Sequence, residues 1–321
     1  MRAWLIAAVI ALPVPLTGCA FHMRSTAVGG PTAAPLAELW TEPADLAQRD
    51  LLHGPGGVQG QPDPHDRFEF VSADTSGASK GFDVRDSKGR EWSAKLGIEA
   101  QSEIAASRIL WAAGYHQPPT YYLPGWTLVQ NGTATEQPAA RFRLKHHMTN
   151  AGPWAWNANP FVGTQEFGGL VVLMVIINNW DLKTSNNVMY DVEGADGRAR
   201  WFVVKDLGAA FGKTGSTGMF FGRFRGSKNT VADYEREPFI KSVEGDKVTV
   251  HFHGAVYVPV LPHTIRVSDV KWICERLNRL SDQQWHEAFR AAGYSDDVGD
   301  RYVKRLKEKV AQGLAVNTTS R

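Results

Sequence analysis

A short stretch around residue 181 combines side chains that could support phosphoryl transfer. In Asp181-Leu-Lys183-Thr-Ser-Asn186, a lysine follows the aspartate by two positions and an asparagine follows it by five. This reaction needs a group that orients the acceptor hydroxyl, a cation on the transferred phosphate and ligands for metal ions. Asp181 could face the hydroxyl, and Lys183 could face the phosphate. Asn186 could offer its amide oxygen to a metal, while Asp206, returned by a predicted hairpin, could add a carboxylate.

The segment upstream of this loop predicts a small antiparallel sheet with one helix. Alternating apolar residues and intervening turn residues predict strands at 68–71, 82–85, 92–96, 120–123, 127–130 and 141–144. Ser102 could cap a helix that runs to Ala113, with Gly114 ending it. Apolar residues on one face of that helix would pack it against the sheet.

The chain from residue 150 onward predicts a larger, mainly helical part. The asparagine- and proline-rich stretch 150–160 indicates a connection between two lobes. The unbroken apolar run 170–177 is a buried helix or a buried strand, and periodicity does not decide between them. Strands at 188–190 and 201–204 form the hairpin before Asp206. Helices are predicted at 267–280, 282–292 and 300–314.

These motifs and their order resemble those of the protein-kinase-like superfamily. Asp181-Leu-Lys-x-x-Asn186 resembles the catalytic loop, and Asp206-Leu-Gly208 resembles the metal-binding Asp-Phe-Gly element, with a hairpin between them as in that fold. The resemblance extends over residues 68–210 and is to divergent atypical kinases, such as phosphoinositide-kinase-like, secretory-pathway and toxin-type serine kinases. Asn179-Trp180 stands in place of the usual His-Arg. Regulation through activation-loop phosphorylation is therefore not expected.

The resemblance also implies a nucleotide site. Lys95, on the third predicted strand, would pair with the phosphates of ATP or another nucleotide, with Mg²⁺ or Mn²⁺ as the metal. Glu103 would orient this lysine, and Glu99 is the competing assignment. Gly77 and Gly81 would belong to the loop that covers the phosphates, although they do not form a full Gly-x-Gly-x-x-Gly pattern.

The expected fold class is α+β, with a bilobal, protein-kinase-like arrangement. A small antiparallel-sheet lobe over residues 66–150 would bind the nucleotide, and a larger, mainly helical lobe over 151–315 would carry the catalytic loop. Glycine and proline punctuate the preceding segment, so 19–65 is expected to be a tether. Residues 1–18 are expected to be a signal peptide.

The first residues indicate a bacterial lipoprotein signal. Met1-Arg2 precedes an apolar run over 3–15, which is short and contains two prolines, and Leu16-Thr-Gly-Cys19 resembles a lipobox. Lipidation of Cys19 would anchor the mature chain in a membrane, with the domain on the periplasmic or extracellular face. Ala20 after the cysteine favours the outer membrane over inner-membrane retention. The alternative is an ordinary secretory signal with an incidental cysteine.

Composition narrows the classes of partner and scaffold. The 43% of hydrophobic residues and the net charge of +2 exclude a disordered chain. The same near-neutral balance, 35 basic against 33 acidic residues, gives no general attraction to nucleic acid, and none is expected as a partner. Two cysteines cannot form a disulfide scaffold or a four-thiolate zinc site.

Two functions remain open from the sequence. The first is a membrane-anchored, kinase-like phosphotransferase that uses a nucleotide and Mg²⁺ or Mn²⁺, with an unknown protein, lipid or sugar acceptor. The second is a catalytically silent, pseudokinase-type lipoprotein that serves as an envelope binding or structural protein, since a fold alone does not fix a function. The scarcity of ATP outside the cytoplasm is the physical conflict that separates them.

Several other features carry weaker signals. His251 and His253 would share a strand face, which suits a metal, but no third ligand is evident. Residues 212–227, rich in glycine, phenylalanine and basic side chains, could receive an anionic substrate or could be a solvated loop. The adjacent His146-His147 would not face the same way, and Cys274 is expected to be a buried thiol.

Overall fold

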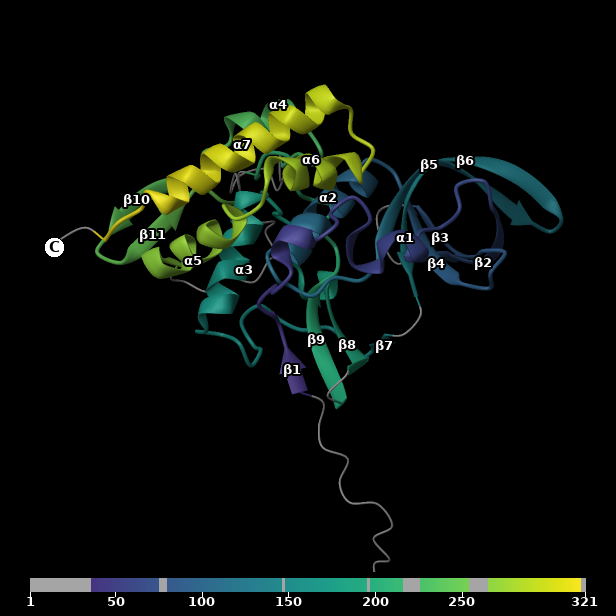
Figure 1. Cartoon of the computed structure of the whole chain (residues 1–321), viewed down its shortest axis with the longest axis horizontal. Helices are drawn as coiled ribbons and strands as arrows, with labels where there is room; N and C mark the ends of the chain where they lie inside the picture. Colours follow the sequence, from purple (N-terminus) through teal and green to yellow (C-terminus); the bar gives the residue numbers. More distant parts are fainter. Residues whose placement is uncertain are drawn as a thin grey trace, which may run out of the picture. The chain divides into compact units, whose positions relative to one another are not determined.

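A computed structural model describes residues 36–74, 80–145, 148–194, 197–215, 226–253 and 265–318. Cys19, Gly77 and His146-His147, together with residues 216–225 of the basic segment, lie outside the described residues. Across the described ranges, no helix has both the length and the apolar character needed to cross a membrane. The described chain is a mixed α/β structure (Figure 1).

The predicted small sheet is a closed barrel. Its strands, in barrel order, are β2 (Arg67–Asp74), β3 (Gly81–Arg85), β4 (Glu91–Leu96), β6 (Thr133–Leu144) and β5 (Thr120–Gln130). The antiparallel meander β2–β3–β4 is confirmed, and the two strands predicted within 120–130 are one continuous strand. The prediction of a wholly antiparallel sheet is wrong, because β2 pairs with β5 in parallel and thereby closes the barrel.

Aromatic side chains fill the barrel and fix which way each strand faces. Phe68, Trp92, Trp126 and Phe142 are almost completely buried there, and the rings of Phe68 and Phe142 lie 4.9 Å apart. Successive side chains of a strand point to opposite faces. In β4 the buried residues alternate with less buried ones, so Trp92 enters the barrel while Lys95 points away from its core.

Helix α2 (Glu99–Ala112) follows β4 and lies against it. It begins four residues before the start that a Ser102 cap predicts, so Ser102 is inside the helix and is not its cap. The Ser102 hydroxyl instead donates to the backbone oxygens of Glu99 and Gly208, at 3.1 and 2.8 Å. Gly114, with a φ of +100°, ends the helix as predicted.

The helices that follow residue 160 pack around a second and larger hydrophobic cluster. The apolar run at 170–177 is helical: it forms most of α3 (Gln165–Ile176), which Thr164 caps by accepting from the Phe167 N–H. The other helices are α1 (Gly57–Gly60), α4 (Val231–Arg236), α5 (Val267–Leu277), α6 (Asp282–Arg290) and α7 (Asp296–Leu314). The three predicted C-terminal helices are confirmed, although α7 begins four residues earlier than expected.

The hairpin predicted before Asp206 is confirmed. It consists of β8 (Asn187–Gly194) and β9 (Gly197–Val204), with β7 (Thr149–Asn150) beside β8. Further along the chain, β10 (Ile240–Glu244), β11 (Lys247–Val250) and β12 (Ile265–Arg266) form a small antiparallel sheet.

The segment expected to be a tether differs from that expectation over residues 36–65. Strand β1 (Leu36–Glu38) pairs in parallel with β9, and the two lie side by side in Figure 1. Leu39, Leu46 and Leu51 are buried in the larger cluster. Glycine and proline here form the turns of a packed segment. Burial of the leucines between them removes apolar surface from water, and the segment would lose that stabilisation if it were a solvated tether.

A buried histidine lies beside this N-terminal strand. The ring of His116 stacks on Trp201, with ring centroids 4.4 Å apart, and its side chain is only 12% exposed. Burial, assisted by the nearby Arg49 cation, lowers the pKa of His116 to about 4. Glu38 Oε2 lies 3.4 Å from Nε2 and opposes this shift, but it already accepts from the Trp201 indole N–H. Burial is therefore the stronger effect.

This histidine should make the protein less stable in mild acid. Between its ordinary pKa of 6.5 and the folded value of about 4, the unfolded chain binds a proton that the folded chain excludes, so stability falls as the pH falls. At about pH 5 the loss should reach about 2 kcal/mol. Urea unfolding at neutral pH and at about pH 5 should show this loss in the wild type and in the exposed-site control His65→Phe, but not in His116→Phe. Equal losses in all three proteins would contradict the assignment.

Candidate functional site

Lys95 lies at the centre of three carboxylates. Its Nζ is 2.8 Å from Glu99 Oε2, 3.4 Å from Glu103 Oε2 and 3.2 Å from both carboxylate oxygens of Asp206. Strand β4 directs the lysine out of the barrel, and α2 presents the two glutamates one turn apart on the same face. The structure thus brings Asp206 to Lys95 and Glu103, although Asp206 lies more than a hundred positions after them in the sequence.

The charges in this cluster stabilise one another. Burial favours the neutral lysine, yet the carboxylates of Glu103, Asp206 and Glu99 raise the pKa of Lys95 above its ordinary value. Burial likewise opposes ionisation of Asp206, but Lys95 and the Gly208 N–H lower the pKa of this carboxyl. Lys95 and Asp206 are therefore both charged at neutral pH.

Both glutamates contact Lys95, so the alternative left open by the sequence has a geometric answer. Glu99 makes the shorter contact with the lysine and also pairs with Lys228. Glu103 is buried, and its other oxygen, Oε1, faces two arginines: Arg141 Nε at 2.9 Å and Arg143. Glu103 thus links the lysine to β6, while Glu99 links it to the segment after residue 226.

The two arginines were not predicted as site residues, although the strand pattern contained a signal. Arg141 and Arg143 are two apart on a predicted strand, so they share one face. Lys95 and Arg141 are direct partners across β4 and β6. Arg143 also donates to the Lys205 carbonyl at 2.7 Å, one residue before Asp206. What the sequence did not contain is the pairing of these two strands.

The loop around Asp181 is held from both sides. Asn179 N–H donates to the Met174 carbonyl at 2.9 Å, which ties the start of the loop to α3. The Asn186 amide donates to the Asp181 carbonyl at 2.6 Å, which closes the loop at its other end. Lys183 Nζ lies 3.0 Å from Asp181 Oδ2. The three residues singled out by spacing therefore lie together.

The β8–β9 hairpin returns Asp206 to this loop. The Asn186 carbonyl accepts from the backbone N–H groups of Lys205 and Asp206, at 2.9 and 3.0 Å. Gly208 then approaches Glu99 so closely that a Cβ at this position would lie 2.7 Å from the Glu99 Cβ. A glycine is needed there because the backbone passes directly against α2.

The oxygen atoms at this point fit a metal that is shared with phosphate. Asp206 supplies a carboxylate that is one-third exposed, and Asn186 supplies an amide oxygen. Asp181 Oδ1 is buried without a hydrogen-bond partner in the described chain. Within the same residues, no three His, Cys, Asp or Glu side chains form a metal cluster. Magnesium is commonly bound by one or two carboxylates, with waters and substrate phosphates as its other ligands. The few protein oxygens at this point therefore suit Mg²⁺ that is bound together with a phosphate.

Gly81 lies at the edge of this cluster. It pairs with Lys95 across β3 and β4, and a Cβ at this position would lie 3.1 Å from the Ala94 carbonyl oxygen. Its backbone is therefore close to the lysine. Gly77, assigned with it to the phosphate-covering loop, lies outside the described residues.

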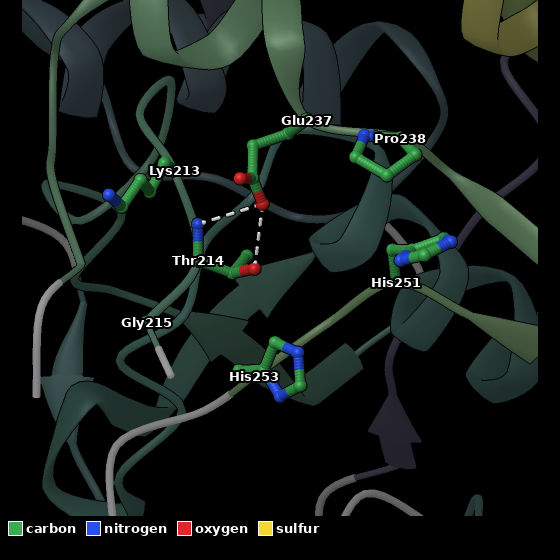
Figure 2. A pocket seen from close by; sticks show the side chains of 7 residues that line it. All are labelled: Lys213, Thr214, Gly215, Glu237, Pro238, His251 and His253. Atoms are coloured by element: carbon green, nitrogen blue, oxygen red, sulfur yellow. Dashed lines mark hydrogen bonds between the residues drawn. The ribbon is translucent and has the colours of Figure 1, made fainter. Parts of the chain in front are cut away.

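A cavity of about 420 Å³ lies beside the segment that follows Gly208. Figure 2 shows the side chains around it, with Thr214 donating through its N–H and its hydroxyl to Glu237 at 3.2 and 2.9 Å. His251 and His253 also line it. They follow β11 and do not lie on a strand, so the predicted shared strand face is wrong, and no described residue completes a metal cluster with them.

Comparisons with known proteins find similarity only to solved structures. No family model matches the chain, and no curated protein matches its sequence. A proinflammatory kinase from Helicobacter pylori, CtkA, is 9% identical, with a TM-score of 0.37 over 77% of this chain and 98% of that one. The Rio2 kinase from Chaetomium thermophilum, in an ADP/Mg²⁺-phosphoaspartate complex, is 11% identical, with a TM-score of 0.34 over 76% of this chain and 72% of that one. These structural neighbours are protein kinases, but a likeness at such TM-scores does not assign a function to this chain.

Proposed function

We propose that this protein is a kinase-like phosphotransferase that uses a nucleotide and Mg²⁺ or Mn²⁺. The observation that carries the proposal is the position of Lys95 Nζ, 3.2 Å from both carboxylate oxygens of Asp206, while the backbone of Asp206 is bonded to Asn186. A cation for phosphate and oxygens for a metal thus meet beside the Asp181 loop. This is the set of groups that phosphoryl transfer requires.

Each group has a role that follows from its surroundings. Lys95 would exchange part of its contact with Asp206 for the inner phosphates of the nucleotide. Asp206 and Asn186 would hold the metal, which supplies charge neutralisation on the phosphate oxygens when bound. Glu103, fixed by Arg141 and Arg143, would keep the lysine in place.

Asp181 and Lys183 would act on the acceptor side. The unpartnered Asp181 Oδ1 can accept a hydrogen bond from an acceptor hydroxyl and orient it toward the phosphate. Lys183 Nζ, now 3.0 Å from Asp181 Oδ2, would place its charge on the transferred group. The acceptor could be a protein, a lipid or a sugar.

The bilobal arrangement belongs to the same proposal. The barrel with α2 would form the nucleotide-binding lobe, close to the expected 66–150, and α3 onward would form the larger lobe over 151–315. Residues 36–52 would belong with the larger lobe, since their buried leucines join its hydrophobic cluster. The site would then lie where β4, α2 and the Asp181 loop meet.

A ligand panel on the wild-type protein tests the proposal. ATP and other nucleotides should raise the melting temperature, and Mg²⁺ or Mn²⁺ should increase the shift, because a ligand that binds only the folded state stabilises it by mass action. Transfer to protein, lipid and sugar acceptors should be scored with the same panel. Metal-dependent binding without transfer would support the silent pseudokinase-type protein, and no nucleotide binding would reject the phosphotransferase.

We further propose that Cys19 anchors the domain in a membrane, on the periplasmic or extracellular face and in the outer membrane where there are two membranes. The proposal rests on the lipobox-like Leu16-Thr-Gly-Cys19. Wild-type protein should take up labelled fatty acid and fractionate with membranes. Cys19→Ser should take up no label and should keep its signal segment, whereas Cys274→Ser, a control at the buried cysteine, should behave as the wild type. Unlabelled wild-type protein would refute the anchor.

A further inference from the structure

Arg108 is a completely buried arginine whose head group is only partly satisfied. Its relative exposure is 0%, and Nη2 donates to the carbonyls of His53 and Thr120, at 3.2 and 2.7 Å. Nε and Nη1 have no hydrogen-bond partner in the described chain. A buried cation without full partners is costly to a fold. Its presence therefore calls for an explanation.

The surroundings keep this arginine charged without neutralising it. Burial lowers the pKa of Arg108 to about 10, which leaves the guanidinium protonated at neutral pH. The ring of Tyr121 lies 5.8 Å from the guanidinium carbon and gives weak support. Gly54 packs so closely that any side chain there would collide with the guanidinium. The fold thus makes room for the charge, and in the described chain the hydrogen-bond acceptors of the guanidinium are two carbonyl oxygens.

A cavity of about 380 Å³ adjoins the arginine. Besides Arg108, its lining includes His53, Tyr122 and Arg290, and Arg290 is exposed near the end of α6. Asp50, whose negative charge favours the protonated form of Arg108, is bonded to the His53 ring at 2.6 Å and does not line the cavity. Two arginines from separate helices therefore border one opening.

The cavity is separate from the proposed nucleotide site. Arg108 follows Glu99 by nine residues, which places it about 180° around α2 from that glutamate. None of the residues that surround Lys95 lines the cavity. An anion that binds there would not compete with the nucleotide for the same groups.

We propose that this cavity binds a phosphate group, with Arg108 and Arg290 as its cationic partners. Guanidinium groups match phosphate oxygens in geometry and charge, and a tetrahedral anion can accept from donors that approach from α2 and α6 together. The phosphate could be free or part of a larger molecule. Inorganic phosphate contains the shared chemistry and is the probe of choice.

Calorimetric titration of the wild type with inorganic phosphate, at constant ionic strength, should show saturable binding. Arg290→Gln should weaken it about tenfold or more, as the loss of one charge-assisted contact predicts. Arg67→Gln removes the same charge from an exposed position on β2 and should leave the affinity unchanged. Arg108→Met should abolish binding if it folds, and Arg290→Gln decides the matter if it does not.

The source of any signal can be assigned with two further arms. Lys95→Met should retain phosphate binding, because its side chain belongs to the other site. Phosphoserine and glycerol phosphate should compete with inorganic phosphate if a larger molecule can present the group, and their failure would restrict the site to the free ion. The proposal is overturned if acetate produces the same heat as phosphate or if Arg290→Gln binds phosphate as the wild type does. It is also overturned if Lys95→Met loses phosphate binding while the arginine variants retain it. None of these outcomes depends on phosphotransferase activity.

Discussion

Asp181→Asn should lower turnover by about 10²–10⁴-fold, the range typical of losing a positioned acid–base group. The substitution keeps the shape of the side chain and removes its charge. Because Asp181 would act on the acceptor hydroxyl as the transition state forms, nucleotide affinity should change little. The expected pattern is a loss of phosphoryl transfer, measured under single-turnover conditions, with an unchanged nucleotide-dependent melting shift.

A structural role for Asp181 predicts a different pattern. The side chain pairs with Lys183, which is one-third exposed, so the pair should contribute less than about 1 kcal/mol to stability. A melting temperature well below that of the wild type, with proportional losses of binding and transfer, would indicate such a role. Asp191→Asn is the matched control. Asp191 also pairs with a basic side chain, that of Arg200 across the β8–β9 hairpin, but it lies outside the site. If the wild type and Asp181→Asn both bind nucleotide but neither transfers phosphate, the result would favour the silent alternative.

The sequence was sufficient to place the groups that chain order and local pattern control. Alternation in β4 sends Lys95 out of the barrel, and a hairpin of two predicted strands returns Asp206 to Asn186. Both placements depend on segments that are close in the sequence, and both follow from the alternation of apolar and polar residues in strands. The helix that carries Glu99 and Glu103 was also evident, although its start was placed too late because Ser102 resembles a cap.

The remaining features depend on contacts between distant segments, which no local pattern contains. The parallel pairing of β2 with β5 is set by barrel closure. Packing of Leu39, Leu46 and Leu51 depends on a hydrophobic cluster built mostly by residues more than a hundred positions away. Lys228 reaches Glu99 across 129 positions. Glycine- and proline-rich composition suggested a tether, and burial of a few leucines outweighed it.

Asp206→Asn should remove the metal dependence of nucleotide binding and lower turnover by about 10³-fold or more, since a metal on phosphate oxygens is worth several kcal/mol in the transition state. The variant should still fold. Lys95 would keep Glu99 and Glu103 as partners, at 2.8 and 3.4 Å, so the substitution leaves no buried charge unpaired. Asn186 alone would offer a neutral oxygen, which is too weak a ligand set for Mg²⁺.

Thermal shifts with ATP in the presence and absence of Mg²⁺ provide the measurement. In the wild type the metal should enlarge the nucleotide shift, and in Asp206→Asn the two shifts should coincide. Asp83→Asn is the control, because Asp83 forms a similar lysine pair, with Lys145 at 2.8 Å, on the outside of the barrel. If Asp206→Asn retained the full effect of Mg²⁺, Asp206 would not be a metal ligand, and its place beside Lys95 would be a purely structural ion pair. If both proteins responded to ATP but neither to the metal, the cleft would bind nucleotide without the chemistry proposed for it. The paired carboxylate and lysine would then serve nucleotide binding alone.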